Sequence, residues 1–328
     1  MKKAMYFIIV SVLLVLNSSL CNGQLFYTFN KDLMKKELEN LKNSTLYVVI
    51  DETANDKNAE YAKIFEENWK YSKVVIISPK ELPNYLKEGN FFFTLILTYD
   101  IGFDFEKPAA FQSFSYKLWT PDVDNLKKMK KKIASGKDIN FSQLATPLAN
   151  INLIFDKSES FTVEDVMNGE YFGNGYPLYS GIGIFKNYLQ GFQTFLKTNG
   201  DFSMTMCNKA EIKKLKKGTL YVPASILVDN SGITFSNYKK NKKPALDAEE
   251  IFADYPGKYE VISIKDLNEK IINNDEPIYY ISKPNTNIIV VTNSKTGELI
   301  FQHTFNESLD KLVKRNLKKL INNLEDEK

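Results

Sequence analysis

One short pattern occurs twice in the chain and constrains its fold more than any other feature. Residues 41–48 and 215–222 are identical at six of eight positions without a gap, in the pattern LKxxTLYV. A second shared pattern, ISxK[DE]L, follows each copy at residues 77–82 and 262–267. Self-similarity of this kind is typical of repeated structural units. The sequence therefore predicts an internal duplication, with two tandem related α/β modules.

Strands and helices are expected to alternate within each module. In the first module, unbroken apolar runs are typical of strands buried on both faces, and they lie at residues 46–50, 74–77 and 91–98. A helix over 59–69 with Asn58 as its cap, and a short one beginning at Ser78 and Pro79, lie between them. This alternation predicts mostly parallel sheets flanked by helices.

The second module is expected to repeat this order and to end in a hairpin. Its predicted strands and helices alternate at 219–222, 246–255, 259–264, 265–273 and 278–282. Strands over 287–292 and 298–305 are joined by Asn293–Gly297, whose composition fits a tight turn and predicts an antiparallel C-terminal edge. Apolar residues at helical spacing predict a final helix over 309–321.

Four segments are expected along the chain. They are a signal peptide (1–23), a first module (24–105), a connecting segment (106–207) and a second module (208–328). Within the connecting segment we expect strands at 111–119 and 151–155 and helices at 122–134 and 161–166. Apolar residues recur every three or four positions over 184–197, which predicts a long buried helix that bridges the two modules.

The first residues have the pattern of a secretory signal. Lys2 and Lys3 precede a short apolar run at 6–16, and small residues follow before Gln24. The apolar run is shorter than the roughly 20 residues that cross a bilayer. We therefore expect an exported mature chain in the periplasm or outside the cell. Lipid attachment at Cys21 is an alternative, which Leu20 disfavours because such sites prefer a small residue there.

The cysteine content argues against a disulfide-stabilised protein, and the charge argues against a nucleic-acid-binding protein. After cleavage only Cys207 remains, so the expected mature chain has no internal disulfide. Removal of Lys2 and Lys3 lowers the formal net charge from +3 to +1, which gives no general attraction to nucleic acid. The lysine run at 127–132 is interpreted as the solvated face of a helix.

Acidic residues after two predicted strands are candidates for a metal site. Asp51 and Glu52 follow the first strand, and Asp100 follows the third. Ligands of open α/β sheets bind beyond the carboxyl ends of the strands, and clustered carboxylates suit Mg²⁺ or Ca²⁺. Alternatively, these acidic residues cap helices or keep the protein soluble. The second repeat favours this interpretation, because it has Pro223 and Ala224, and no acidic residue, at the corresponding place.

A glycine-rich loop at 168–183 is the second candidate site. Tyr171, Tyr176 and Tyr179 lie in it, and their aromatic faces would suit a sugar ring or a protein partner. The alternative is that they pack over the following helix. The loop lacks the context of a nucleotide-binding fingerprint. His303 in a predicted strand and Cys207 without a CxxC partner are interpreted as structural residues.

Taken together, these motifs resemble a family of secreted proteins of unknown function from Gram-negative bacteria. The resemblance is carried by the signal sequence, both LKxxTLYV copies, the ISxK[DE]L step and residues 183–190. The resemblance implies a similar arrangement of strands and helices, and it implies no activity. This chain departs from the pattern of its own first copy at Pro223 and in the loop that follows.

The sequence favours a binding protein over an enzyme. We expect an exported non-enzymatic protein that binds an envelope protein or a small ligand between its two modules. The alternatives are a metal-assisted hydrolase at Asp51, Glu52 and Asp100, or a carbohydrate-active protein that uses the tyrosine-rich loop. A structural assembly subunit, which would add strands at the terminal hairpin edge, is a third class.

Overall fold

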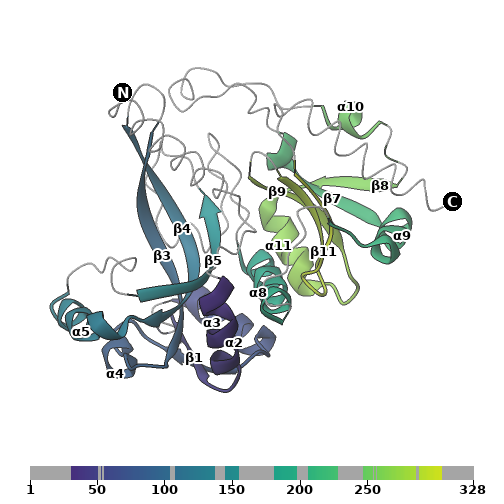
Figure 1. The fold of residues 1–328 in the computed structure, drawn as a ribbon. Helices are drawn as coiled ribbons and strands as arrows, with labels where there is room; N and C mark the ends of the chain where they lie inside the picture. The colour runs from purple at the N-terminus through teal and green to yellow at the C-terminus, as the bar shows by residue number, and fades with distance from the viewer. Residues whose placement is uncertain are drawn as a thin grey trace, which may run out of the picture.

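The fold consists of two mixed sheets, each built on three parallel strands (Figure 1). The computed structural model describes residues 31–50, 53, 55–103, 108–136, 145–154, 181–197, 206–227, 247–253, 255, 257–285 and 288–304. The first sheet has the order β2-β1-β3-β4-β5, with bounds Lys73–Ile77, Thr45–Val49, Phe91–Phe103, Pro108–Pro121 and Ala145–Ile154. The second has the order β6-β11-β10-β9-β7-β8, with bounds Met206–Cys207, Leu299–Thr304, Ile288–Asn293, Tyr279–Asn285, Thr219–Pro223 and Lys258–Ile262.

The two sheets share one strand order. β1 is parallel to both β2 and β3, as β7 is parallel to both β8 and β9. Antiparallel strands then continue each sheet from its third parallel strand, β4 and β5 in one and β10 and β11 in the other. The chain is therefore an α/β protein with two similar modules, as the sequence predicts.

Helices lie on both faces of the sheets. Their bounds are α2 Lys31–Lys42, α3 Asp56–Asn68, α4 Leu82–Tyr85, α5 Leu126–Ala134, α8 Ile182–Lys197, α9 Lys209–Lys217, α10 Ala248–Phe252 and α11 Ile264–Asn273. Short 3-10 helices span Val123–Asn125 (η1) and Ala224–Leu227 (η2). Among the described residues, no helix is both long and apolar enough to cross a membrane.

The repeated Leu-Tyr pair defines two faces in each sheet, because successive strand residues point to opposite sides. We call the side of Leu46 and Leu220 the leucine face, and the side of Tyr47 and Tyr221 the tyrosine face. Both leucines are fully buried. In the first sheet α3 covers the leucine face, where Phe65 contacts Phe93, while the tyrosine face packs against α4 and α5.

The second sheet has the same two faces. Tyr279 lies opposite Leu220 and therefore shares the leucine face, and it bonds Glu211 of α9. Tyr280 lies opposite Tyr221 on the tyrosine face, where its hydroxyl bonds Asn187 of α8. The same face carries α11, whose Lys270 ammonium lies 5.0 Å from the centre of the Tyr221 ring.

Helix α8 joins the two modules through opposite faces. It packs against α3 on the leucine face of the first sheet and against α11 on the tyrosine face of the second (Figure 1). Phe192 and Phe185 contact the aromatic residues of the first sheet and its helix α3. Its buried residues belong to one apolar core that includes both Leu46 and Leu220. The bridging helix predicted over 184–197 is thus confirmed.

Close approach of the α8 and α11 backbones explains why residue 183, in the first turn of α8, is a glycine. A Cβ atom on Gly183 would lie 2.6 Å from the backbone oxygen of Asn268 and 2.9 Å from Ile271 Cβ on α11. The Asn268 side chain accepts a hydrogen bond from Ile184 N over 3.0 Å. Only a residue without a side chain lets the first turn of α8 approach α11 so closely.

Several predicted elements differ in extent from those observed. The first sheet includes β4 and β5, which lie beyond the expected module boundary at residue 105; the division at 105 and 207 stays a prediction. Strand β3 continues past 98 to Phe103, and α4 is a single turn. Asn55 rather than Asn58 caps α3, since its side chain accepts the Asn58 N–H. The predicted elements at 161–166 and 309–321 lie outside the described residues.

Candidate functional site

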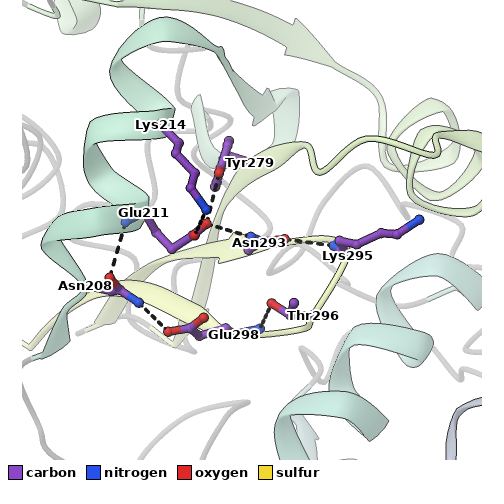
Figure 2. Close-up of polar contacts among 8 residues, drawn as sticks. All are labelled: Asn208, Glu211, Lys214, Tyr279, Asn293, Lys295, Thr296 and Glu298. Atoms are coloured by element: carbon purple, nitrogen blue, oxygen red, sulfur yellow. Dashed lines mark hydrogen bonds and ion pairs between the residues drawn. The ribbon is translucent and has the colours of Figure 1, made fainter.

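A cluster of polar side chains surrounds Glu211 in the first turn of α9 (Figure 2). Asn208 caps this helix, because its Oδ1 accepts a hydrogen bond from Glu211 N over 3.2 Å. Buried Ile212 and Leu215 hold α9 on the sheet, and lysines in its last turn complement the helix dipole. Local sequence therefore builds the helix and places a half-buried carboxylate beside strands β9 and β10.

Both carboxylate oxygens of Glu211 accept hydrogen bonds. Oε2 accepts from Tyr279 Oη over 3.0 Å and from Asn293 Nδ2 over 2.8 Å. Oε1 pairs with Lys214 Nζ over 2.5 Å. Three donors thus converge on one carboxylate from α9, β9 and β10 (Figure 2).

These contacts keep Glu211 ionised. Burial alone would raise its pKa, but hydrogen bonds from Lys214, Asn293 and Tyr279 outweigh it, so the pKa of Glu211 lies below its ordinary value. Burial together with the neighbouring Glu211 carboxylate raises the pKa of Tyr279, which stays protonated as a donor. Glu211 is therefore suited to anchoring α9.

A second set of contacts joins the cluster to the β10–β11 hairpin. Asn293 Oδ1 accepts from Lys295 N over 2.9 Å, and Asn208 Nδ2 donates to Glu298 Oε1 over 2.6 Å (Figure 2). Gly297 adopts φ 66°, a left-handed conformation that suits glycine in such a turn. The Glu211 cluster thus fixes α9 and the hairpin to each other.

The predicted metal ligands are placed only in part. Asp51 and Glu52 lie outside the described residues. Val49, the last residue of β1, lies opposite Thr94, and Asp100 is six residues further along β3, roughly 20 Å away at about 3.3 Å per residue. The expectation that Asp100 follows the strand end is therefore wrong, since its backbone pairs with Phe111 inside β3. Metal binding by these three residues stays a prediction.

Within the described ranges, no group of three or more His, Cys, Asp or Glu side chains could hold a metal ion. Tyr171, Tyr176 and Tyr179 lie outside those ranges, so the tyrosine-rich ligand site stays a prediction. His303 lies in β11, where its backbone pairs with Ile289 of β10, and the backbone of Cys207 in β6 pairs with Phe301 of β11. Strand β6 therefore covers part of the hairpin edge that was expected to be open.

The lysine run at 127–132 lies where the sequence predicts. Within α5, Met129 is buried against the tyrosine face of the first sheet, while Lys127, Lys128, Lys130 and Lys131 are exposed. The run is thus the solvated side of an amphipathic helix.

The sequence did not predict the Glu211 cluster. Its members come from three segments that lie far apart along the chain, so no local pattern joins them. One local signal was available: Asn208 followed by Glu211 is the N-cap and third-residue acid pattern that marks a helix start. That signal would have located α9, which was also not predicted.

A scan against protein-family models finds no match to the chain, and a search of curated proteins finds none either. The resemblance to a family of secreted proteins therefore stays a prediction.

Proposed function

We propose that the mature chain is an exported protein that acts by binding another protein of the cell envelope. Its first residues support export, with Lys2 and Lys3 before the apolar run at 6–16. The Glu211 cluster, in which three donors engage one carboxylate, fixes α9 and the hairpin within the second module.

The observation that carries the proposal is the way α8 fills the space between α3 and α11. Gln193 on one side of α8 bonds the backbone at Asn68 and Lys70, and Asn187 on the other side bonds Ser294 O and Tyr280 Oη. Aromatic side chains, Phe65 of α3 and Trp69 just after it against Phe185 and Phe192 of α8, pack on the first of these two sides. A partner is therefore expected on the outer surfaces of the joined modules, and a protein suits such surfaces better than a small ligand, which prefers a concave pocket.

Co-purification tests the proposal. The full chain, tagged at its C-terminus, is recovered from its native envelope after mild cross-linking and compared by quantitative mass spectrometry with a tagged, unrelated exported protein. We expect a mature chain that begins at Gln24 and one envelope protein at a reproducible stoichiometry. Recovery of the chain with no partner above the control level would overturn the binding proposal, and recovery from the cytosol with residues 1–23 intact would overturn export.

A further inference from the structure

The internal packing leaves one face of each sheet directed outward. Helix α8 joins the leucine face of the first sheet to the tyrosine face of the second. The opposite faces are covered by other helices: α4 and α5 lie on the tyrosine face of the first sheet, and α9 and α10 lie on the leucine face of the second. In Figure 1, α5 and α10 lie at opposite ends of the molecule.

Helices α3 and α10 are corresponding elements of the two modules. Each follows the central parallel strand and precedes the neighbouring parallel strand, and each is capped by a side chain, Asn55 and Asp247. Each also places a phenylalanine in the core beside its sheet, Phe65 in one and Phe252 in the other. The surface that α3 presents to α8 therefore has a counterpart on α10.

Helices α8 and α5 hold corresponding positions on the tyrosine faces. On the second sheet, Asn187 of α8 bonds Tyr280 of β9. On the first sheet, Met129 of α5 packs in one cluster with Phe92 of β3, and Phe92 is the counterpart of Tyr280 in strand register. A contact between α10 of one molecule and α5 of another would therefore correspond in position to the α3–α8 contact inside one molecule.

The charges of these two helices are complementary. Helix α5 exposes Lys127, Lys128, Lys130 and Lys131, whereas α10 exposes Glu249 and Glu250 next to its cap Asp247. Opposite charges of this kind steer two surfaces together and set their register.

Each surface also exposes an apolar side chain. Val123, just before α5, is 53% exposed, and Val261, on the leucine face two residues after Tyr259, whose ring stacks on Phe252 of α10, is 41% exposed. Among the described residues three large apolar side chains are exposed, and the third, Ile272 on α11, lies on neither surface. An apolar centre with a charged rim is the usual anatomy of a protein interface.

We propose that copies of this chain associate head to tail, with the lysine face of α5 on one copy against the acidic helix α10 of the next. The contact is heterologous and continues in an open row, because each copy keeps one free surface of each kind. This inference goes beyond the proposed function, and it holds or fails without regard to a foreign envelope partner.

Sedimentation velocity of the purified mature chain tests the proposal. At about 0.02 M salt we expect the mean sedimentation coefficient to rise with protein concentration, and at about 0.5 M salt to return to the monomer value, because salt screens exposed charges. A monomer at every concentration in low salt would overturn the proposal, as would association that salt leaves unchanged.

Charge reversal identifies the surfaces. Lys127→Glu with Lys131→Glu on α5, and Glu249→Lys with Glu250→Lys on α10, should each abolish association at low salt. An equimolar mixture of the two double variants should restore pairwise association, because the unchanged lysine face of the α10 variant can contact the unchanged acidic helix of the α5 variant. Restoration also shows that both variants are folded. Failure of the mixture to associate would contradict the assignment of these two helices.

The matched control carries the same change of charge elsewhere. Lys36 and Lys42 are exposed on α2, away from both proposed surfaces. Lys36→Glu with Lys42→Glu should associate as the wild type does, within about threefold in apparent Kd, against a loss of at least about tenfold for the α5 variant. Equal loss in both would show a general effect of net charge and overturn the proposed contact.

Discussion

Gln193 on α8 donates a hydrogen bond from Nε2 to the backbone oxygen of Asn68, the last residue of α3, over 2.7 Å. Its Oε1 accepts from the backbone N–H of Lys70 over 2.5 Å. The side chain is only 5% exposed. One amide thus satisfies two backbone groups at the C-terminal end of α3, where a helix leaves carbonyl groups without internal partners.

Replacement of Gln193 should therefore destabilise the junction of the two modules. Gln193→Leu keeps the approximate volume but leaves the Asn68 oxygen and the Lys70 N–H without that partner, which costs about 1–3 kcal/mol of unfolding free energy. Urea denaturation at neutral pH measures the change. Thr194→Ala on the exposed side of the same helix is the control and should change stability by less than about 0.5 kcal/mol. Equal effects from the two variants would contradict this role of Gln193.

Gly183→Ala should also weaken the junction. The added methyl group would meet the Asn268 backbone oxygen at 2.6 Å, and overpacking of this kind costs about 1–3 kcal/mol. Gly218→Ala is the matched control, because its nearest neighbour would lie at 3.6 Å, an ordinary contact distance. Thermal unfolding by circular dichroism should show a lower Tm for the first variant only. A Tm for Gly183→Ala equal to that of the wild type would contradict the close approach of α8 to α11.

A double-mutant cycle should show that Asn187 and Tyr280 act together. The Tyr280 hydroxyl donates to Asn187 Oδ1 over 3.1 Å, and both side chains are buried. We expect Asn187→Ala and Tyr280→Phe to be non-additive, with a coupling energy of about 0.5–3 kcal/mol in chemical denaturation. Additive losses would mean that the two side chains stabilise the fold separately.

The Glu211 cluster predicts a specific dependence of stability on pH. Because the pKa of Glu211 is lowered in the folded state, its contribution is fully present above its unfolded pKa of about 4.3 and is lost as pH falls through the folded value. Glu211→Gln should lower the unfolding free energy by about 1.5–3 kcal/mol at pH near 7, the range for hydrogen bonds to charged groups.

That difference between wild type and Glu211→Gln should shrink as the pH falls below about 4, because a protonated glutamate resembles glutamine. Denaturation curves across this pH range measure it. Lys214→Ala is the control: the lysine side chain is 65% exposed, so its loss should cost less than about 1 kcal/mol. A gap that stays constant down to acidic pH would show that Glu211 does not contribute as a carboxylate.

The local fold could be predicted where short segments determine their own structure. The apolar run before Ile50 lies in β1, and the residues over 184–197 lie in α8. An unbroken apolar run is typical of a buried strand, and apolar residues spaced by three and four are typical of an amphipathic helix. The addition of β4 and β5 to the first sheet could not be predicted in this way. Their pairing joins residues far apart in the chain, and their sequences fit a strand in any sheet.

The Glu211 cluster could not be predicted from local sequence either. Glu211, Tyr279 and Asn293 meet only after two strands and a helix have packed, so their mutual hydrogen bonds follow from tertiary structure alone. The repeated Leu-Tyr pair, in contrast, indicated two equivalent sheets. It could not indicate that α8 would contact the leucine face of one and the tyrosine face of the other.

Native-state hydrogen exchange, read by mass spectrometry, tests most directly the claim that α8 makes the two modules one cooperative unit. The slowest amides of β1 and β7 should exchange with the same opening free energy, and Gln193→Leu should lower both by the same amount although Gln193 bonds only the first module. If β1 loses protection while β7 keeps that of the wild type, the modules unfold independently and the account of α8 as their shared core is wrong.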